Sequence, residues 1–232
     1  SNPDVRRISK ERLLRWISMQ PDRRVFWVHP GDGSQWCQCE NCKALDAQPG
    51  NYSDRLLDYV NELAAGVAKE YPGRQLAIAA YSGTERAPRK QKPAENVLVF
   101  YCPYYGIAWS QVHPLTHPLN QVALRQFRAW HEVAPDQMCL YDYNHEIGAD
   151  YLPSWDAAAA KIKWAAQQNV RGEYLCGKPK HMRELFLYMT GRLLWDPRQD
   201  PEALKREFVR AYFGPAVAPV MEYLTLVDNR LK

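Results

Sequence analysis

Short apolar runs alternate along this chain with longer segments in which apolar residues recur every three or four positions. Five of the short runs are rich in β-forming residues, and each becomes aromatic or polar at its carboxyl end, which is typical of strands that lead into functional loops. These predicted strands are 25–28, 76–80, 97–100, 138–140 and 170–176.

Helical periodicity fills the intervals between the predicted strands. Ser53 is expected as the N-cap of a helix that ends at Pro72-Gly73. Asp200 is expected to cap another helix, with Pro201 at its first position. Further helices are predicted at 8–17, 123–130, 154–169, 181–193 and 216–229, whereas 83–96 is predicted as an irregular loop. This order predicts an α/β fold: a parallel sheet with helices outside it, and function at the carboxyl ends of the strands.

Composition indicates an ordinary globular chain, with 46% hydrophobic and 24% charged residues. The net charge of +4 is small and the basic residues are scattered, which argues against nucleic-acid binding. The sequence has neither an apolar leader nor a stretch of about 18 apolar residues that would span a membrane. Because Ser1-Asn2 resembles a tag remnant and the chain starts on a helix, we expect residues 1–232 to be a single domain excised from a larger barrel-containing protein.

Five parallel strands fit either an open doubly wound sheet or part of an eight-stranded barrel. The chain has no Gly-x-Gly-x-x-Gly motif after a strand, so dinucleotide binding has no support. The aromatic and acidic strand ends favour the C-terminal part of a (β/α)8 TIM-like barrel with extra C-terminal helices. Such a fragment has an open sheet edge, which we expect a terminal helix or a second copy of the chain, in a homodimer, to cover.

The loop after the first predicted strand contains several side chains of the kinds used in catalysis and metal binding. His29 and Asp32 come first, and Cys37, Cys39 and Cys42 follow within a few residues. The simpler interpretation is a turn made by Asp32-Gly33, with the cysteines as small apolar residues. The three cysteines fit metal-ligand spacing loosely, with His29 as a fourth ligand, although structural zinc sites usually join two paired ligand sets. A structural zinc site, a disulfide in an exported protein and reduced thiols therefore remain open, and no other cofactor is indicated.

Three segments carry a resemblance to a known family. They are HPGDGSQWCQCENCKALD at 29–46, NYSDRLLDYVNELA at 51–64 and LLWDPRQDPEALKREFVRAYFGPA at 193–216. The sequence resembles an uncharacterised family of large bacterial proteins whose barrel is similar to α-glucuronidases and β-hexosaminidases. The resemblance implies a glycoside hydrolase-like TIM barrel, normally preceded by further strands and a small N-terminal domain. It supplies no assigned reaction, and we expect the full-length protein to be exported.

Glycoside hydrolysis requires two carboxyl groups, roughly 5 Å apart in retaining enzymes and roughly 6.5–9.5 Å apart in inverting ones. Asp142 and Glu173 lie near the ends of successive predicted strands, so they are expected to face one another. By resemblance to α-glucuronidases they would act as general base, with Asp32 or Glu40 as the acid. Alternatively, Asp142 is a buried acceptor and Glu173 forms an inward salt bridge. For His145-Glu146, a turn is the simpler interpretation.

Aromatic side chains gather at the same strand ends, where they could stack on the C–H faces of sugar rings. The expected substrate-binding residues are Trp27, His29, Trp36, Tyr81, Tyr104, Tyr141, Tyr143 and His145; Tyr101 and Tyr174 are further aromatics in these positions. The predicted function is hydrolysis of a uronic-acid or amino-sugar glycan by carboxylate acid/base catalysis. The alternatives are a carbohydrate-binding barrel fragment without catalysis and a zinc-stabilised interaction module.

Overall fold

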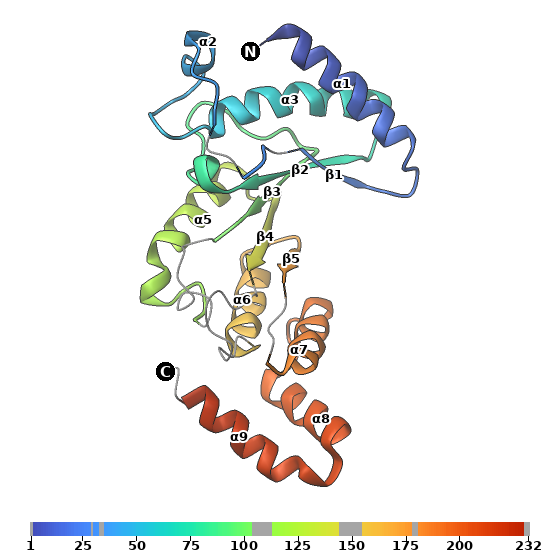
Figure 1. The fold of residues 1–232 in the computed structure, drawn as a ribbon, viewed down its shortest axis with the longest axis vertical. Helices are drawn as coiled ribbons and strands as arrows, with labels where there is room; N and C mark the ends of the chain where they lie inside the picture. The colour runs from blue at the N-terminus through green and yellow to red at the C-terminus, as the bar shows by residue number, and fades with distance from the viewer. Residues whose placement is uncertain are drawn as a thin grey trace. The chain divides into compact units, whose positions relative to one another are not determined.

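A computed structural model describes residues 2–28, 30–32, 35–103, 113–143, 155–177 and 181–229 (Figure 1). His29, Tyr104, His145 and Glu146 lie outside these residues, as does Ser154, with which the predicted helix 154–169 begins. The fold is α/β, as predicted. No described helix is both long and apolar enough to cross a membrane.

The described strands form one sheet in strictly sequential order, β1-β2-β3-β4-β5. They are β1 (Val25–Trp27), β2 (Gln75–Ala80), β3 (Val97–Tyr101), β4 (Met138–Tyr143) and β5 (Glu173–Cys176). The β1–β2, β2–β3 and β3–β4 pairs are parallel, with Trp27 opposite Ala77 and Tyr101 opposite Leu140 in the register. All five predicted strands are therefore confirmed, and so is their adjacency in the sheet.

The described α-helices match the predicted ones apart from the short helix α2, and three single 3-10 turns at Ser82–Thr84, Pro118–Asn120 and Gly214–Ala216 are also additional. The α-helices are α1 (Pro3–Ser18), α2 (Glu40–Lys43), α3 (Ser53–Glu70), α5 (Gln121–Val133), α6 (Trp155–Gln167), α7 (Arg183–Trp195), α8 (Pro201–Phe213) and α9 (Val217–Asn229). Asp200 caps α8 as predicted, because its side chain accepts a hydrogen bond from the backbone N–H of Glu202.

The prediction that Ser53 is the N-cap of α3 is wrong. Tyr52 holds that position, and Ser53 is the first helical residue. The hydroxyl of Ser53 instead donates to the carbonyl oxygens of Thr84 and Arg86, at 3.0 and 2.6 Å. It therefore stabilises the attachment of the 85–96 loop to the start of α3.

The loop predicted between β2 and β3 is irregular, as expected, and one buried carboxylate holds it. Asp54 accepts hydrogen bonds from the backbone N–H groups of Arg89, Lys90 and Gln91, at 2.7 to 3.2 Å. Asp54 is only 1% exposed. Since an unpaired carboxylate could not be buried at low free energy, these three donors explain how the loop can lie over α3 without helical structure.

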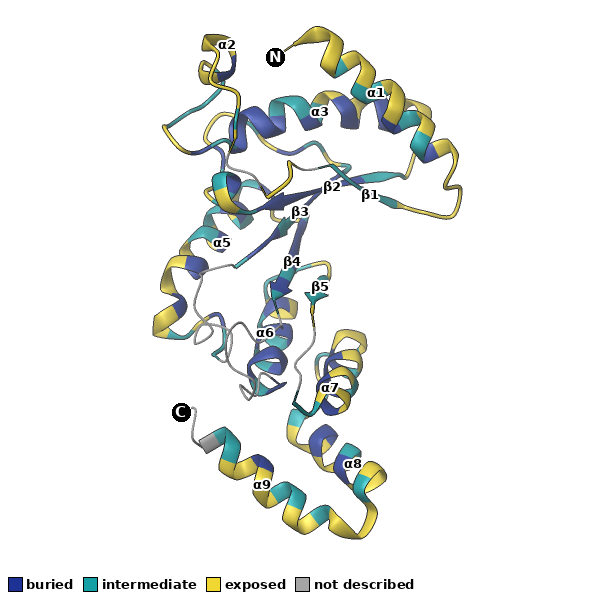
Figure 2. Ribbon diagram, in the orientation of Figure 1, coloured by how far each residue is buried: buried dark blue, intermediate teal, exposed yellow. Residues whose placement is uncertain are grey.

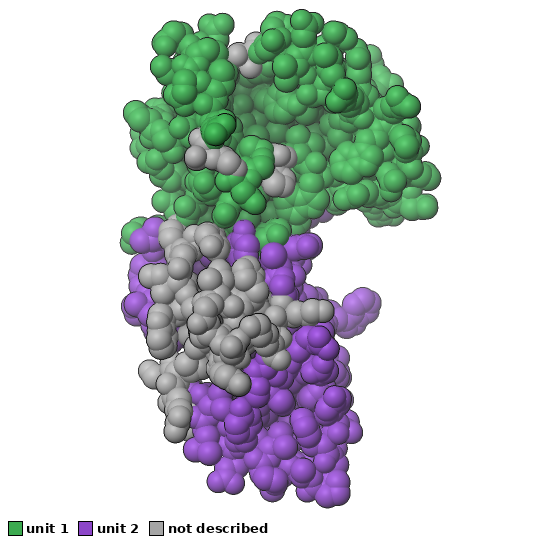
Figure 3. Space-filling view, in the orientation of Figure 1, with its two compact units in different colours: residues 1–102, 125–141 green, residues 103–124, 142–232 purple. Residues whose placement is uncertain are grey.

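The chain divides into two compact units, each described here by itself (Figure 3). Unit 1 comprises residues 1–102 and 125–141, and unit 2 comprises 103–124 and 142–232. In unit 2, helices α6 to α9 share a buried apolar core, part of which is visible as the dark stripes on these helices in Figure 2. The Lys205 ammonium is buried among these helices and pairs with Asp156, Glu202 and Asp228.

In unit 1 the two faces of the sheet have different neighbours. Phe26 contacts Trp16 of α1 edge-on, and Tyr101 contacts Phe127 of α5, so these side chains point to the helices. Trp27 and Phe100 belong to the opposite face, where they pack on a small cluster of Ala77, Leu98 and Cys139. Successive residues of a strand lie on alternate faces, so the residues of β4 can be assigned to these two faces in the same way.

Candidate functional site

A cavity of about 660 Å³ lies in unit 1, where β1 ends. Residues after β1 form one side of it, helices α1 and α3 form others, and the segment 36–45 closes it. Its lining includes four large aromatic residues and three arginines: Trp16, Trp27, Trp36, Tyr59, Arg6, Arg12 and Arg55. Among the described residues no acidic side chain lines it, so the cavity is both aromatic and cationic.

The three arginines differ in how far their charge is neutralised. Arg6 on α1 pairs with Asp58 and Glu62 of α3, which fastens the two helices together. Arg55 pairs with Asp46 and donates to the carbonyl oxygen of Cys37 at 2.7 Å. Arg12 is exposed, and the structure gives it no hydrogen bond or ion pair with any described residue. Its guanidinium is therefore the one most readily available to an anion.

Aromatic stacking holds the part of the cavity wall that contains Trp36. Trp36 stacks on Tyr52 with 4.7 Å between the ring centroids, and the Arg55 guanidinium lies over both rings. Gly83 permits this packing, because a Cβ there would lie 2.7 Å from the Tyr52 ring and 2.9 Å from the Trp36 ring nitrogen. The indole of Trp36 is thus fixed before any ligand arrives.

The carboxyl groups of Asp142 and Glu173 lie close together in unit 2, as the strand order led us to expect. Lys161 of α6 donates to both carboxylate oxygens of Asp142, and both residues are almost fully buried. Both carboxyl oxygens of Glu173 are buried and make no hydrogen bond of good geometry. Burial, together with the nearby Asp142 charge, raises the pKa of Glu173 from 4.5 to about 8. At neutral pH the Glu173 carboxyl is therefore protonated in the folded chain.

This cluster lies in the layer between the strands and α6. Asp142 alternates with Tyr141 along β4, and Tyr141 contacts Trp27 on the opposite face, at 6.2 Å between ring centroids. Asp142 is 2% exposed, so its carboxylate meets α6 rather than an open cleft. Asp32 is an exposed residue of unit 1, and Glu40 pairs with Lys43 at 3.2 Å.

The three cysteines that are close together in the sequence are also close together in space. The sulfur atoms of Cys37, Cys39 and Cys42 all lie within 4.8 Å of one another, and the structure contains them as thiols. Cys37 and Cys39 are exposed, whereas Cys42 is buried and also lines the cavity. They could hold a thiophilic metal ion, a possibility that the sequence left open.

A family model described as "Domain of unknown function (DUF4838)" matches residues 1–225. The chain belongs to the DUF4838 family. The match confirms the resemblance to an uncharacterised family; it does not extend to a similarity with glycoside hydrolases. No curated protein and no solved structure matches this DUF4838 chain.

The remaining predicted substrate-binding residues are spread over the DUF4838 fold. Trp27 contacts Phe100 at 4.5 Å between ring centroids and, at the end of β1, also lines the cavity. Tyr81 is half-buried and lines a small hollow with Trp36. Tyr143 is half-buried at the end of β4 and belongs to unit 2. Of the predicted set, Trp27 and Trp36 are therefore the members within the described residues that line the large cavity.

Sequence reasoning missed both Lys161 and Arg12. Lys161 carries a usable signal: it lies three residues after Ala158 and next to Ile162, on the buried face of α6. A lysine on an apolar helix face requires a buried anion, so a nearby carboxylate could have been inferred. Arg12 gives no such signal, because α1 contains several basic residues and resembles a solvated helix.

Proposed function

We propose that this DUF4838 chain binds an anionic sugar of the uronic-acid class in the cavity at the end of β1. The observation that carries the proposal is the lining, which combines four large aromatic rings with three guanidinium groups and no described acidic side chain. The volume of about 660 Å³ is that of a small-molecule site, for which the usual range is about 300–1,000 Å³.

The side chains that line the cavity favour some classes of sugar over others. Indole faces offer flat apolar surfaces to the C–H faces of a pyranose ring, and the guanidinium fork matches the two oxygens of a carboxylate. A positively charged amino sugar would meet the guanidinium of Arg12, which has no ion pair with a described residue. We therefore favour a uronic acid over a charged amino sugar, and we assign the carboxylate-binding role to Arg12.

The sheet supports a wider proposal, that the chain is part of a glycoside hydrolase-like barrel. Doubly wound sheets reverse their strand order, whereas consecutive strands of a TIM barrel are neighbours, as β1 to β5 are here. In such barrels ligands bind at the carboxyl ends of the strands, which is where the cavity lies with respect to β1. The resemblance of the sequence to α-glucuronidase-like barrels agrees with an anionic sugar, and we propose an exported full-length protein.

Hydrolysis by Asp142 and Glu173 is the second candidate function. Two neighbouring carboxyl groups, of which Glu173 has a pKa raised to about 8, resemble the acid/base pairs of hydrolases. Their burial against α6 favours the alternative, a structural cluster. In the full-length protein, catalysis by this pair predicts that Asp142→Asn and Glu173→Gln each lower turnover by about 10²-fold. A structural role predicts unchanged turnover per folded molecule.

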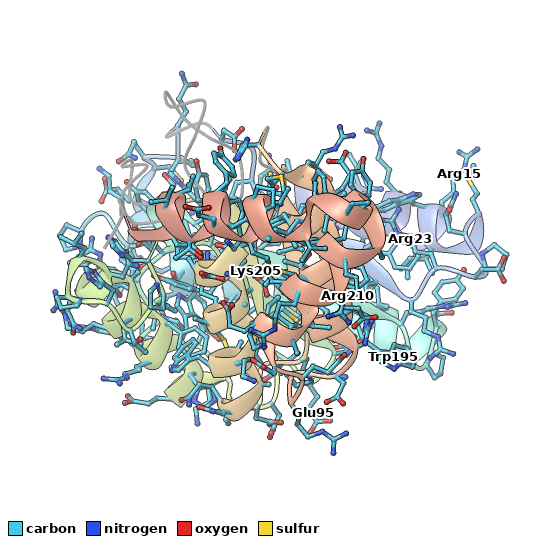
Figure 4. All side chains as sticks on the ribbon, turned by 90° about the horizontal axis from the view of Figure 1, so that it is seen from below. Arg15, Arg23, Glu95, Trp195, Lys205 and Arg210 are labelled. Carbon is cyan, nitrogen blue, oxygen red and sulfur yellow. The ribbon has the colours of Figure 1, made fainter. Side chains whose placement is uncertain are left out.

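Calorimetric titration tests the binding proposal. The ligands are a glucuronic-acid oligosaccharide and the glucose oligosaccharide of the same length and linkage. We expect the acidic ligand to bind more tightly, and Arg12→Ala to weaken it by about tenfold, the effect of losing one charge-assisted hydrogen bond. Arg15→Ala is the matched control, because Arg15 is an exposed arginine of the same helix that does not line the cavity (Figure 4). Equal affinities for both sugars, or equal effects of both substitutions, would overturn the proposal.

A further inference from the structure

The thiol cluster of Cys37, Cys39 and Cys42 is not explained by sugar binding. These residues lie on a short segment that runs from Trp36 through α2 to Asp46. Three sulfur atoms within 4.8 Å of one another form an unusual arrangement, because a disulfide would use two of them and leave the third. One cation placed between them would contact all three.

Local backbone structure fixes these positions. Cys39 is the N-cap of α2, and its carbonyl oxygen accepts hydrogen bonds from the backbone N–H groups of Cys42 and Lys43, at 3.1 and 3.0 Å. This single turn brings the side chains of Cys39 and Cys42 together.

Side chains from other parts of the chain also hold this segment in place. Arg55 of α3 donates to the carbonyl oxygen of Cys37 and pairs with Asp46, so it holds the segment on both sides of the cluster. The ammonium of Lys90 donates to the carbonyl oxygens of Ala44 and Asp46, at 3.4 and 3.5 Å. These cations would also offset the negative charge of a divalent ion with three thiolates. The cluster is therefore held in place rather than assembled by chance on a free loop.

We propose that Cys37, Cys39 and Cys42 bind one thiophilic divalent cation, of the Zn²⁺ class, beside the cavity that Cys42 and Trp36 line. Thiolate ligands select soft and borderline ions such as Zn²⁺ over Mg²⁺ or Ca²⁺. On binding, three S–H groups release their protons to solvent and three metal–sulfur bonds form, without electron transfer. No fourth His, Cys, Asp or Glu side chain joins the group within the described part of the chain. His29, the fourth ligand suggested by the sequence, lies outside that part.

The test uses the whole chain, freed of metal with a chelator, kept reduced and then titrated with Zn²⁺ and Co²⁺ in the absence of sugar. We expect one equivalent of Zn²⁺ per chain by mass spectrometry, and Co²⁺ spectra with the thiolate charge-transfer bands of a tetrahedral site. Cys39→Ser should weaken metal binding at least tenfold, whereas the matched control Cys176→Ser, at a half-buried cysteine of β5, should leave it unchanged.

A further variant tests the buried ligand. Cys42→Ala, shown by circular dichroism to be folded, should also bind the metal at least about tenfold more weakly. Absence of bound metal while all three thiols react with a thiol reagent would overturn the proposal, and so would a disulfide within the cluster in the purified chain. Because the metal titration contains no sugar, failure of the sugar-binding proposal would not affect its outcome.

Discussion

Replacing Glu173 by glutamine should stabilise the protein at neutral pH. Glu173 is buried beside the Asp142–Lys161 pair, and its pKa in the folded protein is about 8 against an ordinary 4.5. Between these two pH values the folded chain holds a proton that the unfolded chain has released. The free energy of unfolding therefore falls as pH rises through this window. Glutamine has nearly the same shape and cannot ionise, so it removes this dependence.

The size of the effect follows from the two pKa values. Each tenfold difference in proton affinity corresponds to about 1.4 kcal/mol. At pH 7 the raised pKa of Glu173 therefore lowers the free energy of unfolding, relative to its value in acid, by on the order of 3 kcal/mol. Near pH 4 the unfolded carboxyl is protonated as well, and the difference should disappear. We expect the glutamine variant to be more stable than the unchanged chain by on the order of 3 kcal/mol at neutral pH and equally stable in acid.

Urea unfolding followed by circular dichroism, at several pH values between about 4 and 8, measures this difference. Glu95→Gln is the control, because Glu95 is exposed and lies at the edge of the view in Figure 4. Asp228, with a pKa raised to about 6 by burial and by Asp156, titrates in all the proteins and cancels in the comparison. If Glu173→Gln instead lowered stability at neutral pH, Glu173 would be ionised there in an inward salt bridge, and our reasoning would be wrong.

Two substitutions test other buried charges by the same unfolding measurement. Lys161→Met would leave the Asp142 carboxylate buried without its cation and should cost about 3–5 kcal/mol; a loss under about 1 kcal/mol would mean that water reaches the pair. Asp54→Ala removes the acceptor of three backbone N–H groups and should cost about 1–3 kcal/mol, with faster proteolysis within 85–96. Asp58→Ala, at a more exposed acid on the same helix, should cost about 1 kcal/mol or less, and an equal loss in both variants would contradict the role assigned to Asp54.

The strands and helices could be predicted because their signals are local. Apolar runs that end in Gly or polar residues gave the five strands, and the Asp200-Pro201 cap of α8 needs only neighbouring backbone. The cap of α3 could not be predicted, because the partners of the Ser53 hydroxyl are carbonyl groups more than thirty positions away in the sequence. Local patterns do not contain such distant partners.

The candidate site was only partly predictable for a similar reason. The proximity of Asp142 and Glu173 follows from strand order, and Asp142 shares its face of β4 with Met138 and Leu140, because residues two positions apart in a strand point to the same side. Because Cys139 and Tyr141 on the other face are also apolar or aromatic, the sequence does not indicate which face of β4 the helices cover. The cavity depends on the packing of α1, α3 and the segment 36–45 against one another, and no periodic pattern in the sequence predicts that packing.

A crystal structure of the chain with a glucuronic-acid oligosaccharide tests the central claim most directly. We predict that the sugar lies in the cavity at the end of β1, with its carboxylate within hydrogen-bond distance of the Arg12 guanidinium and its ring against a tryptophan of the lining. An empty cavity at saturating ligand, or a sugar bound elsewhere on the chain, would contradict this account.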